Sequence, residues 1–284
     1  MRRKVKLTSI NGVAAGQTAT LDLPTGGRRY FKVVSKYKTN AAQATIEADI
    51  TEIRIITNGK VQRRFSTADL NVVNATVNRL AFVLGMIPII FAERSRRTMQ
   101  GEEGLAWGTA DVNTFRIEFD IAGGAVAPTL TAWAEVDDVP TVLGPINKWY
   151  KETFNATGAQ TLNITTLSKR DNYARIHART ALVTAVKVTV DGLDVYDLAR
   201  DEAVEALADR VGLAMQANNF SLIFDDTDQV TDSLPMQRQV GPNSFVPVSE
   251  FRVDLVCSGA GAIPLLIERV GQPDAEKFVG VVGV

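Results

Sequence analysis

The chain has 284 residues, of which 45% are hydrophobic, and its 31 basic and 32 acidic residues nearly cancel. This length suffices for one large domain or two of ordinary size, and the balanced charge excludes a general attraction to nucleic acid or membrane. The single cysteine, Cys257, excludes an internal disulfide, and the N-terminal MRRKVK lacks the apolar stretch of a signal peptide. We therefore expect a protein that folds in a cytoplasm and has no specific nucleic-acid binding.

In chain order, the first strong prediction is a hairpin. Residues 50–59 read ITEIRIITNG, and Asn58-Gly59 is a dipeptide preferred in tight turns, because both central residues of such a turn need positive φ. Residues 66–80 then predict a helix with a capping pair, Ser66 and Asp69. Its apolar stripe consists of Leu70, Val73, Val77 and Leu80.

The most apolar run follows at residues 80–91, LAFVLGMIPIIF, and is interrupted by Gly85 and Pro88. It is shorter than the ~20 residues that a membrane span needs, so it predicts a helix end, a turn and a buried strand. Residues 115–121, FRIEFDI, alternate apolar and charged side chains, which is typical of a strand that is wet on one side.

The strand pattern then stops near residues 138–158, where Pro140, Gly144 and Pro145 lie. We expect the join between two domains here, 1–140 and 141–284, with WYKETF as a short helix or an irregular strap.

The second half repeats the first. VTAVKVTVDG (183–192) matches residues 50–59 and places Asp191-Gly192 on Asn58-Gly59. Residues 200–213 predict a second helix, with a stripe of Val204, Leu207 and Val211. SLIF (221–224) matches PIIF (88–91), TLNIT (161–165) faintly matches TLDLP (20–24), and FRVDLVCSGAGAIPLL (251–266) aligns without gaps on 115–130.

Four matches in the same order indicate a duplicated domain. The glycine-rich turn after residue 257 resembles a dinucleotide-binding motif but does not fit one. Pro264 stands in place of the third glycine, and too few residues follow for a βαβ unit. About eight short antiparallel strands and one helix in each copy predict an all-β fold, a double jelly roll of two tandem eight-stranded sandwiches.

Three stretches carry a resemblance to a known family. LTSINGVAAGQTATLDLP (7–24), WGTADVNTFRIEFDI with APTLTAWA (107–121 and 127–134) and VKVTVDGLDVYDL (186–198) resemble, in order and spacing, the major coat protein of corticoviruses. These are tailless icosahedral bacteriophages with double-stranded DNA and an internal membrane. The similarity extends from about residue 5 to about residue 225 and is weaker over the last fifty residues.

The resemblance implies a structural protein and not an enzyme: a homotrimer that presents six barrels as a pseudo-hexagon and packs with neighbouring trimers over a lipid vesicle. Its expected partners are those trimers, a vertex or spike protein, and membrane proteins or anionic lipid of the vesicle. Its expected location is the virion capsid, after assembly in the host cytoplasm.

The two copies differ in charge after the matched strands PIIF and SLIF. The first continues with Arg94, Arg96 and Arg97, and the second with Asp225, Asp226 and Asp228. We expect the basic loop of one chain to face the acidic loop of its neighbour in the trimer. An alternative use of the aspartates is a calcium site, because calcium prefers several oxygen ligands; no other cofactor is expected.

The N-terminal Arg2, Arg3, Lys4 and Lys6 are either a solvated terminus or a contact with the anionic inner membrane, where each basic residue is worth about 1 kcal/mol. The family resemblance implies that the N-terminus lies at the inner side of the shell.

Enzymatic readings find little support. His177 is the only histidine, too few for a cupin-like metal site, and no G-x-S-x-G motif presents a nucleophile. Cys257 alternates with core residues and is expected to be buried, and the pairs Glu102-Glu103 and Asp137-Asp138 lie in polar loops.

The main alternative is a carbohydrate- or receptor-binding tandem β-sandwich, either a lectin or a spike protein. Such a site would use an exposed aromatic platform, for which Trp107, Trp133 and Trp149 are the available tryptophans.

Overall fold

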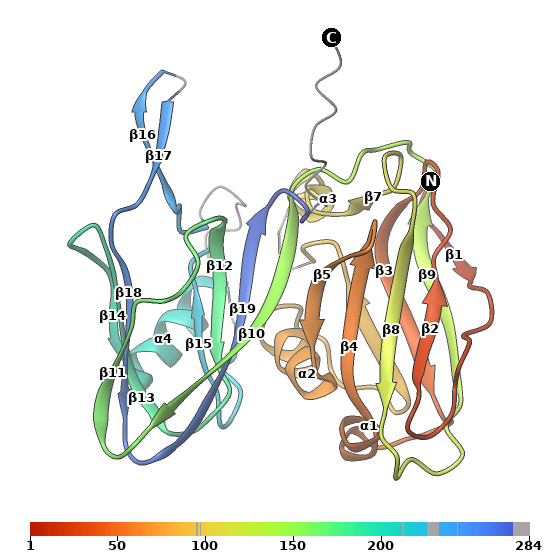
Figure 1. The fold of residues 1–284 in the computed structure, drawn as a ribbon, viewed down its shortest axis with the longest axis horizontal. Helices are drawn as coiled ribbons and strands as arrows, with labels where there is room; N and C mark the ends of the chain where they lie inside the picture. The colour runs from red at the N-terminus through yellow and green to blue at the C-terminus, as the bar shows by residue number, and fades with distance from the viewer. Residues whose placement is uncertain (95, 97, 212, 226–232, 243, 275–284) are drawn as a thin grey trace.

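Two β-barrels stand side by side in the structure, a computed structural model that describes residues 1–274 except 95, 97, 212, 226–232 and 243 (Figure 1). Each barrel is a sandwich of two antiparallel sheets around its own hydrophobic core, with helices at the edges. The double jelly roll predicted from the sequence is confirmed.

The first barrel packs a sheet of order β1-β9-β3-β6, with β7 on β3, against a sheet of order β5-β4-β8-β2. Its strands are β1 (Arg3–Lys6), β2 (Thr18–Asp22), β3 (Arg29–Tyr37), β4 (Ile50–Thr57), β5 (Lys60–Phe65), β6 (Met86–Ile90), β7 (Trp107–Gly108), β8 (Phe115–Ile121) and β9 (Leu130–Asp137). Its helices are α1 (Gln43–Asp49), α2 (Thr67–Thr76) and α3 (Met99–Glu103).

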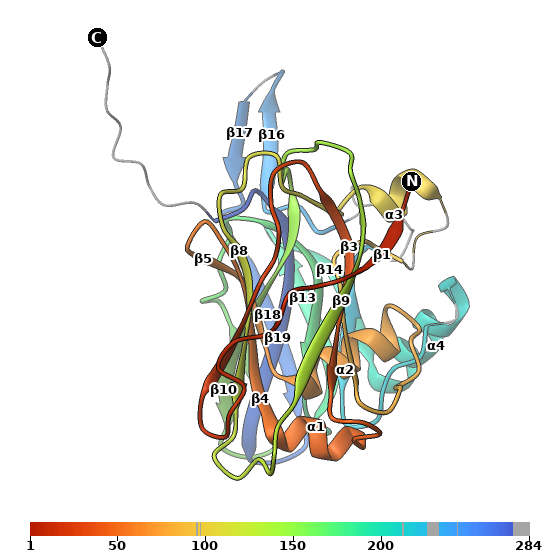
Figure 2. The ribbon, with the colours of Figure 1, turned by 90° about the vertical axis from the view of Figure 1, so that its right-hand side faces the viewer.

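The second barrel packs β15-β12-β19-β10 against β11-β18-β13-β14 and carries a separate two-stranded sheet, β16-β17. Its strands are β10 (Ile146–Ala156), β11 (Gln160–Ile164), β12 (Asn172–Ala178), β13 (Val183–Val190), β14 (Leu193–Ala199), β15 (Phe220–Ile223), β16 (Gln237–Gly241), β17 (Ser244–Pro247), β18 (Phe251–Cys257) and β19 (Gly261–Gly271). One helix, α4 (Arg200–Val211), lies beside them (Figure 2).

The strand orders of the two barrels are the same. β1-β9-β3-β6 corresponds to β10-β19-β12-β15, and β5-β4-β8-β2 corresponds to β14-β13-β18-β11. All four sequence matches fall on equivalent strands: β2 with β11, β4 with β13, β6 with β15, and β8 with β18. The duplication inferred from the sequence is therefore present in the topology.

The alternating strands bury the predicted faces. In β8, Phe115, Ile117 and Phe119 are buried between the sheets, and in β18 Phe251 and Val253 take the same place. The period-2 pattern identified these faces because successive side chains of a strand point to opposite sides.

Both predicted hairpin turns are present. Asn58 and Gly59 join β4 to β5 with φ of 48° and 76°, and Asp191 and Gly192 join β13 to β14 with φ of 48° and 79°. These left-handed conformations explain the Asn-Gly and Asp-Gly dipeptides.

The helices differ from the prediction in number and detail. The first barrel has three helices and not one. The Ser66–Asp69 capping box of α2 is present, and the helix ends at Thr76. In α4 the buried residues include Ala203, which joins the core of the second barrel, and Leu207, which joins the core of the first, whereas Val204 is exposed. The side chain of Val211 lies outside the described part of the chain.

The predicted strap is wrong. Residues 146–156 form β10, an eleven-residue strand that pairs along its whole length with β19. Its first four residues are buried on both faces because it lies at the contact of the two barrels, so the half-buried alternation that identifies other strands begins only at Tyr150.

No helix within the described residues is long and apolar enough to cross a membrane.

Candidate functional site at the junction of the two barrels

A continuous sheet connects the two barrels. β10 pairs with β19 of the second barrel on one side and touches β5 of the first barrel on the other, where Trp149 lies opposite Arg63 in parallel register. The resulting eight-stranded sheet has the order β15-β12-β19-β10-β5-β4-β8-β2. The junction of the barrels is therefore built from backbone pairing and side chains together.

Arg63 is completely enclosed at this contact. Its Nε donates to the carbonyl of Asn147 at 2.7 Å and its Nη1 to the carbonyl of Ile90 at 2.6 Å. The guanidinium also lies 4.9 Å from the ring centre of Trp149 and 5.2 Å from that of Trp107. Burial lowers the pKa of Arg63 to about 10, so the group stays a cation at neutral pH.

Arg175, on β12, lies at the centre of a buried charge cluster. It contacts three carboxylates: Asp225 at 2.7 Å, Glu93 at 2.7 Å and Glu268 at 3.0 Å. Burial alone would lower the pKa of Arg175, but attraction to these three groups raises it well above its ordinary value. Because Glu93 belongs to the first barrel and the others to the second, one guanidinium links both.

Glu268 contacts three different side chains of the cluster. Besides Arg175, the Nδ2 of Asn147 donates to it at 2.7 Å, and the Nε2 of His177 lies 2.9 Å from its other oxygen. Burial would raise the pKa of Glu268, but Arg175, His177 and Asn147 together lower it to about 2. His177 itself is fully buried and its Nδ1 lies 2.9 Å from the hydroxyl of Ser221, so the only histidine has the structural place expected for it.

Asp225 joins Arg175 to Arg96. Its carboxylate lies 2.9 Å from Arg96 Nη2, and both side chains are at most 2% exposed. Burial, opposed by the attraction of Arg175, raises the pKa of Asp225 to about 6. For Glu93 the attraction of Arg175 outweighs burial and lowers the pKa. We name Arg63, Glu93, Arg96, Asn147, Arg175, His177, Asp225 and Glu268 the junction cluster.

Arg96 and Asp225 correct one expectation. The charge complementarity that followed PIIF and SLIF is present, but the two side chains meet inside one chain, between its own barrels, and are too buried to face a neighbouring chain. Arg94 is exposed and free to take a different role. Arg97, Asp226 and Asp228 lie outside the described residues, and so does the predicted calcium site that needs these aspartates.

A second contact across the junction involves Asp274. The side-chain amide of Gln62, on β5, bonds to both the backbone oxygen and the backbone N–H of Asp274, at 2.8 and 2.9 Å. The Asp274 carboxylate accepts from Tyr150 at 2.8 Å and from the buried Lys148 at 3.2 Å, and Lys148 also pairs with Asp171 at 2.8 Å. The segment after β19 thus fastens the second barrel to β5 of the first.

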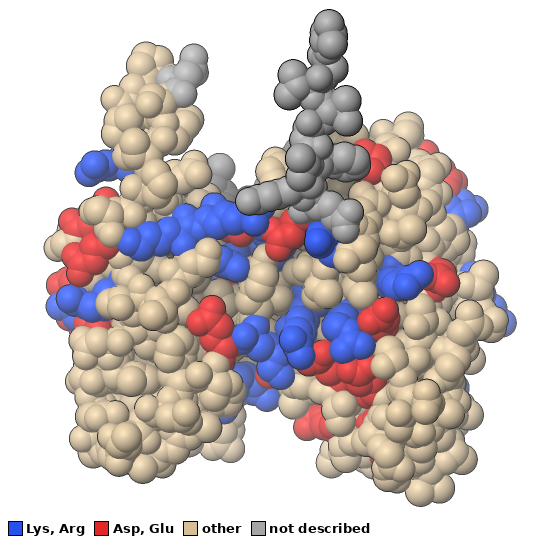
Figure 3. All heavy atoms as spheres, in the orientation of Figure 1, with Lys and Arg blue, Asp and Glu red and all other residues tan. Residues whose placement is uncertain are grey.

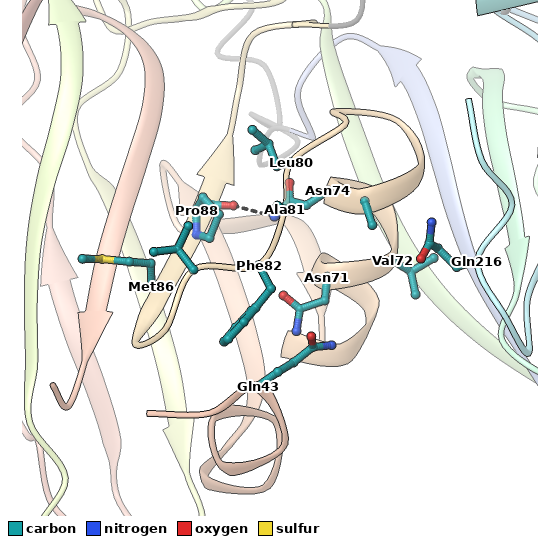
Figure 4. A pocket seen from close by; sticks show the side chains of 12 residues that line it. Gln43, Asn71, Val72, Asn74, Leu80, Ala81, Phe82, Met86, Pro88 and Gln216 are labelled. Atoms are coloured by element: carbon teal, nitrogen blue, oxygen red, sulfur yellow. Dashed lines mark hydrogen bonds between the residues drawn. The ribbon is translucent and has the colours of Figure 1, made fainter. Parts of the chain in front are cut away.

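Figure 4 shows a surface pocket of about 270 Å³ beside α2, close to the second barrel. Asn71, Phe82 and Gln216 line it, and Asn74 donates to the carbonyl of Pro88 at 2.9 Å. Its lining holds no charged side chain, so it offers none of the groups that acid–base or metal chemistry needs.

The N-terminal basic residues divide into two pairs. Arg2 bonds to Glu102 and Glu103 at 3.0 and 2.9 Å, and Arg3 bonds to Asp138. Lys4 and Lys6 are exposed on β1. Glu102 and Glu103, predicted in a polar loop, lie in α3 and hold Arg2. Of the second pair, Asp138 holds Arg3, whereas Asp137 is buried at the end of β9 and pairs with Arg29 at 2.7 Å.

The predicted aromatic platform for carbohydrate is absent from these three tryptophans. Trp107 and Trp149 are buried at the junction, and Trp133 is half-buried with the ammonium of Lys32 5.4 Å from its ring centre. Cys257 is a free, buried thiol whose pKa burial raises. Among the described residues no three His, Cys, Asp or Glu side chains gather as a metal site would require.

Sequence reasoning missed Arg63, Lys148, Arg175 and Glu268, which are all buried in strands. The available signal was a charged residue at an inward position of an otherwise apolar strand, as in YARIHAR and LLIERV. Such a residue is rarely buried without a partner, and the partner lies in a distant segment.

Comparison with known proteins matches both halves of the chain to one family. The model of the viral coat protein P2 N-terminal domain matches residues 4–137, and that of the viral coat protein P2 C-terminal domain matches residues 146–273. The major capsid protein P2 of Pseudoalteromonas phage PM2 is 25% identical over 252 residues, in an alignment that covers 84% of this chain and 89% of that protein.

Solved structures agree on the fold. The crystal structure of the major capsid protein P2 from bacteriophage PM2 is similar with a TM-score of 0.84 at 22% identity, covering 98% of this chain and 99% of that chain. The STIV MCP has a TM-score of 0.66 at 10% identity, with 95% and 96% covered. PBCV-1 VP54, fitted into a reconstruction of the virophage Sputnik, has a TM-score of 0.63 at 12% identity, with 95% and 93% covered.

Proposed function

This chain belongs to the viral coat protein P2 family, and from that premise we propose that it forms homotrimers that pack as an icosahedral shell over an internal lipid membrane. The observation that carries the proposal is the junction between two equivalent barrels. A trimer can present a ring of six similar units only if each chain supplies two, held in one fixed orientation.

The two barrels meet that requirement. They have the same strand order, and Figure 1 shows their β4–β5 and β13–β14 turns near the same end of the molecule. The continuous sheet, the junction cluster and the Asp274 contact each tie one barrel to the other. A buried ion cluster tolerates little displacement, because a guanidinium that leaves its carboxylates exposes unpaired charge in a low-dielectric site.

Light scattering coupled to gel filtration tests the trimer. The expected mass is three times the 30.8 kDa of one chain and does not change on dilution. An obligate interface usually buries more than ~2,000 Å² in total, so dissociation at working concentrations is not expected. A stable monomer would contradict the proposed function.

The shell would bring the chain into contact with neighbouring trimers, a vertex or spike protein, and the membrane proteins or anionic lipid of the vesicle, with assembly in the host cytoplasm. Lys4 and Lys6 are the N-terminal cations left exposed for the lipid contact, since Arg2 and Arg3 already pair with acidic groups.

The lipid contact of the N-terminus can be tested without removing β1. Replacing both Lys4 and Lys6 by Gln should leave the trimer mass unchanged and weaken binding to anionic vesicles at low salt, since each cation near such a surface is worth about 1 kcal/mol. Unchanged vesicle binding would assign the N-terminus no role at the membrane.

A further inference from the structure

The second barrel carries a projection for which the first has no counterpart. Among the residues that the structure describes, β16 and β17 pair only with each other, in the connection between β15 and β18. The equivalent connection of the first barrel, between β6 and β8, holds α3 and β7 instead. Figures 1 and 2 show the β16–β17 hairpin extending beyond the end of its barrel.

Two exposed apolar side chains flank the turn at the tip of this hairpin. Val240 is 55% exposed and Phe245 is 59% exposed, although side chains of this kind are usually covered. An isolated two-stranded hairpin is marginally stable in water, so exposed apolar groups there need a reason other than folding. In Figure 3 the hairpin is a mostly uncharged projection.

The hairpin itself carries a single charged side chain, the cation of Arg238, and the exposed acidic residues Asp191 and Glu250 lie at its base. No acidic residue occurs between Ser233 and Ser249, and Arg238 at the base has a side chain that is 66% exposed, 4.0 Å from Asp191. Lys169, which is half-buried, donates to the carbonyl of Ser249 beneath the hairpin. Two exposed apolar side chains with the exposed cation of Arg238 below them match the boundary between the acyl chains and the anionic headgroups of a bilayer.

We propose that the β16–β17 hairpin inserts Val240 and Phe245 into the headgroup region of the internal membrane. The inference rests on the proposed function, which supplies that membrane. The hairpin extends from the same end of the molecule as the N-terminus, which carries the exposed Lys4 and Lys6 (Figure 1).

Shape and size favour lipid over a protein partner. The hairpin is a narrow convex projection, whereas a lasting protein contact usually buries more than ~1,200 Å² between matched surfaces. A bilayer needs no matching groove, and many weak contacts add up when a shell presents its copies together.

The test uses the full-length protein and vesicles of phosphatidylcholine and phosphatidylglycerol in equal parts. Replacing both Val240 and Phe245 by Ser should lower the ratio of vesicle-bound to free protein at least tenfold, because a tenfold change corresponds to about 1.4 kcal/mol and burial of even one such apolar side chain contributes about that much. Val126→Ser is the matched control, because Val126 is 78% exposed in the loop between β8 and β9, at the opposite end of the molecule.

Depth is measured separately with Phe245→Trp, whose fluorescence should be quenched by brominated lipid while that of the wild-type tryptophans is not. Unchanged binding of the double Ser variant, or no quenching, would overturn the inference. A loss of oligomer mass in the double variant without lipid would assign the tip to a contact between copies and overturn it as well. If the wild type forms trimers but binds no vesicles, the inference fails and the trimer stands.

Discussion

At the scale of single residues, Arg175 offsets the repulsion among the buried carboxylates of the junction cluster. Three buried carboxylates would repel one another strongly, and the guanidinium contacts all of them within 3.0 Å. Removing charges from water is so costly that a buried network of this kind adds little net stability. Its effect is to make one arrangement of the two barrels much better than any displaced one.

Replacing Arg175 by Gln should therefore destabilise the chain by about 3–5 kcal/mol, the usual cost of leaving buried charges without their partner. Arg64→Gln is the control: Arg64 is also paired, with Glu52 at 2.8 Å, but its side chain is 60% exposed, so about 0–1 kcal/mol is expected. Urea unfolding of both variants measures the difference. Equal losses of unfolding free energy in the two variants would show that burial does not determine how much the Arg175 contacts contribute.

Glu268 predicts a dependence on pH. Its pKa in the folded chain is about 2, against an ordinary 4.5, so its contribution is complete above pH 4.5 and is lost as the pH falls toward 2. The difference in unfolding free energy that Glu268→Gln makes should be constant from pH 7 to 5 and shrink by up to about 3 kcal/mol toward pH 2.

Asp225 acts in the opposite direction, because its raised pKa gives a contribution that is lost as the pH rises through about 6. Because the charge of Glu268 helps to raise the pKa of Asp225, the comparison is made in an Asp225→Asn background, in which Asp225 no longer titrates. A difference that grows on acidification would contradict the ion pairing of Glu268.

The sequence indicated part of this site. Opposite charges after two equivalent strands correctly marked segments that attract, since Arg96 meets Asp225. Charge alone does not say whether the partner lies in the same chain, so the contact was assigned to a neighbour. Arg175 and Glu268 could not be found, because their burial depends on β12 and β19 lying against the first barrel. That contact joins segments far apart in the sequence, so no local pattern reports it.

At the scale of elements, the two barrels repeat one detail beyond strand order. Asn58 Oδ1, in the β4–β5 turn, accepts from the backbone N–H of Asn113 at 2.8 Å, just before β8. Asp191 Oδ1, in the β13–β14 turn, accepts from the backbone N–H groups of Ser249 and Glu250, just before β18. Each turn residue thus fixes the start of the strand that lies beside its hairpin.

Substitution by Gly separates the effect of the side-chain hydrogen bond from the effect of the positive φ of the turn. Asn58→Gly and Asp191→Gly keep a residue that accepts positive φ but remove the side-chain acceptor, and each should lower the free energy of unfolding. Asp191→Gly should cost more, since the carboxylate also accepts from the Ser249 hydroxyl at 2.6 Å. Chemical denaturation measures both; no loss in either variant would leave the positive φ as the only reason for these residues.

Elements were the level at which sequence was most informative. Alternation identified β8 and β18, and turn dipeptides identified two hairpins, because both signals are local. β10 was wrongly predicted as a strap because its signal is not local. Its first residues, including Lys148, are buried by the contact between the barrels, so they show no alternation of exposed and buried side chains.

At the scale of the whole molecule, the two cores are not independent. Trp149 belongs to β10, which pairs with the second barrel, yet it packs in the core of the first, with its ring centre 4.8 Å from that of Phe65. Ile223 and Leu266 of the second half contribute to the same core. Unfolding one barrel would therefore expose apolar surface of the other, which predicts a single cooperative transition.

Calorimetry of two truncated aromatics tests this coupling. Trp149→Ala and Phe119→Ala both remove a large buried side chain, and each should cost roughly 3–5 kcal/mol. Phe119 lies in β8, inside the first barrel and away from the junction, so its loss should lower the temperature of one transition without dividing it. Trp149→Ala should divide the transition in two, because it removes the side chain that the second barrel supplies to the first core.

Protein concentration must be equal in all scans, since an oligomer's midpoint depends on it. Two transitions already in the wild type would show that the junction orients the barrels without coupling their stability.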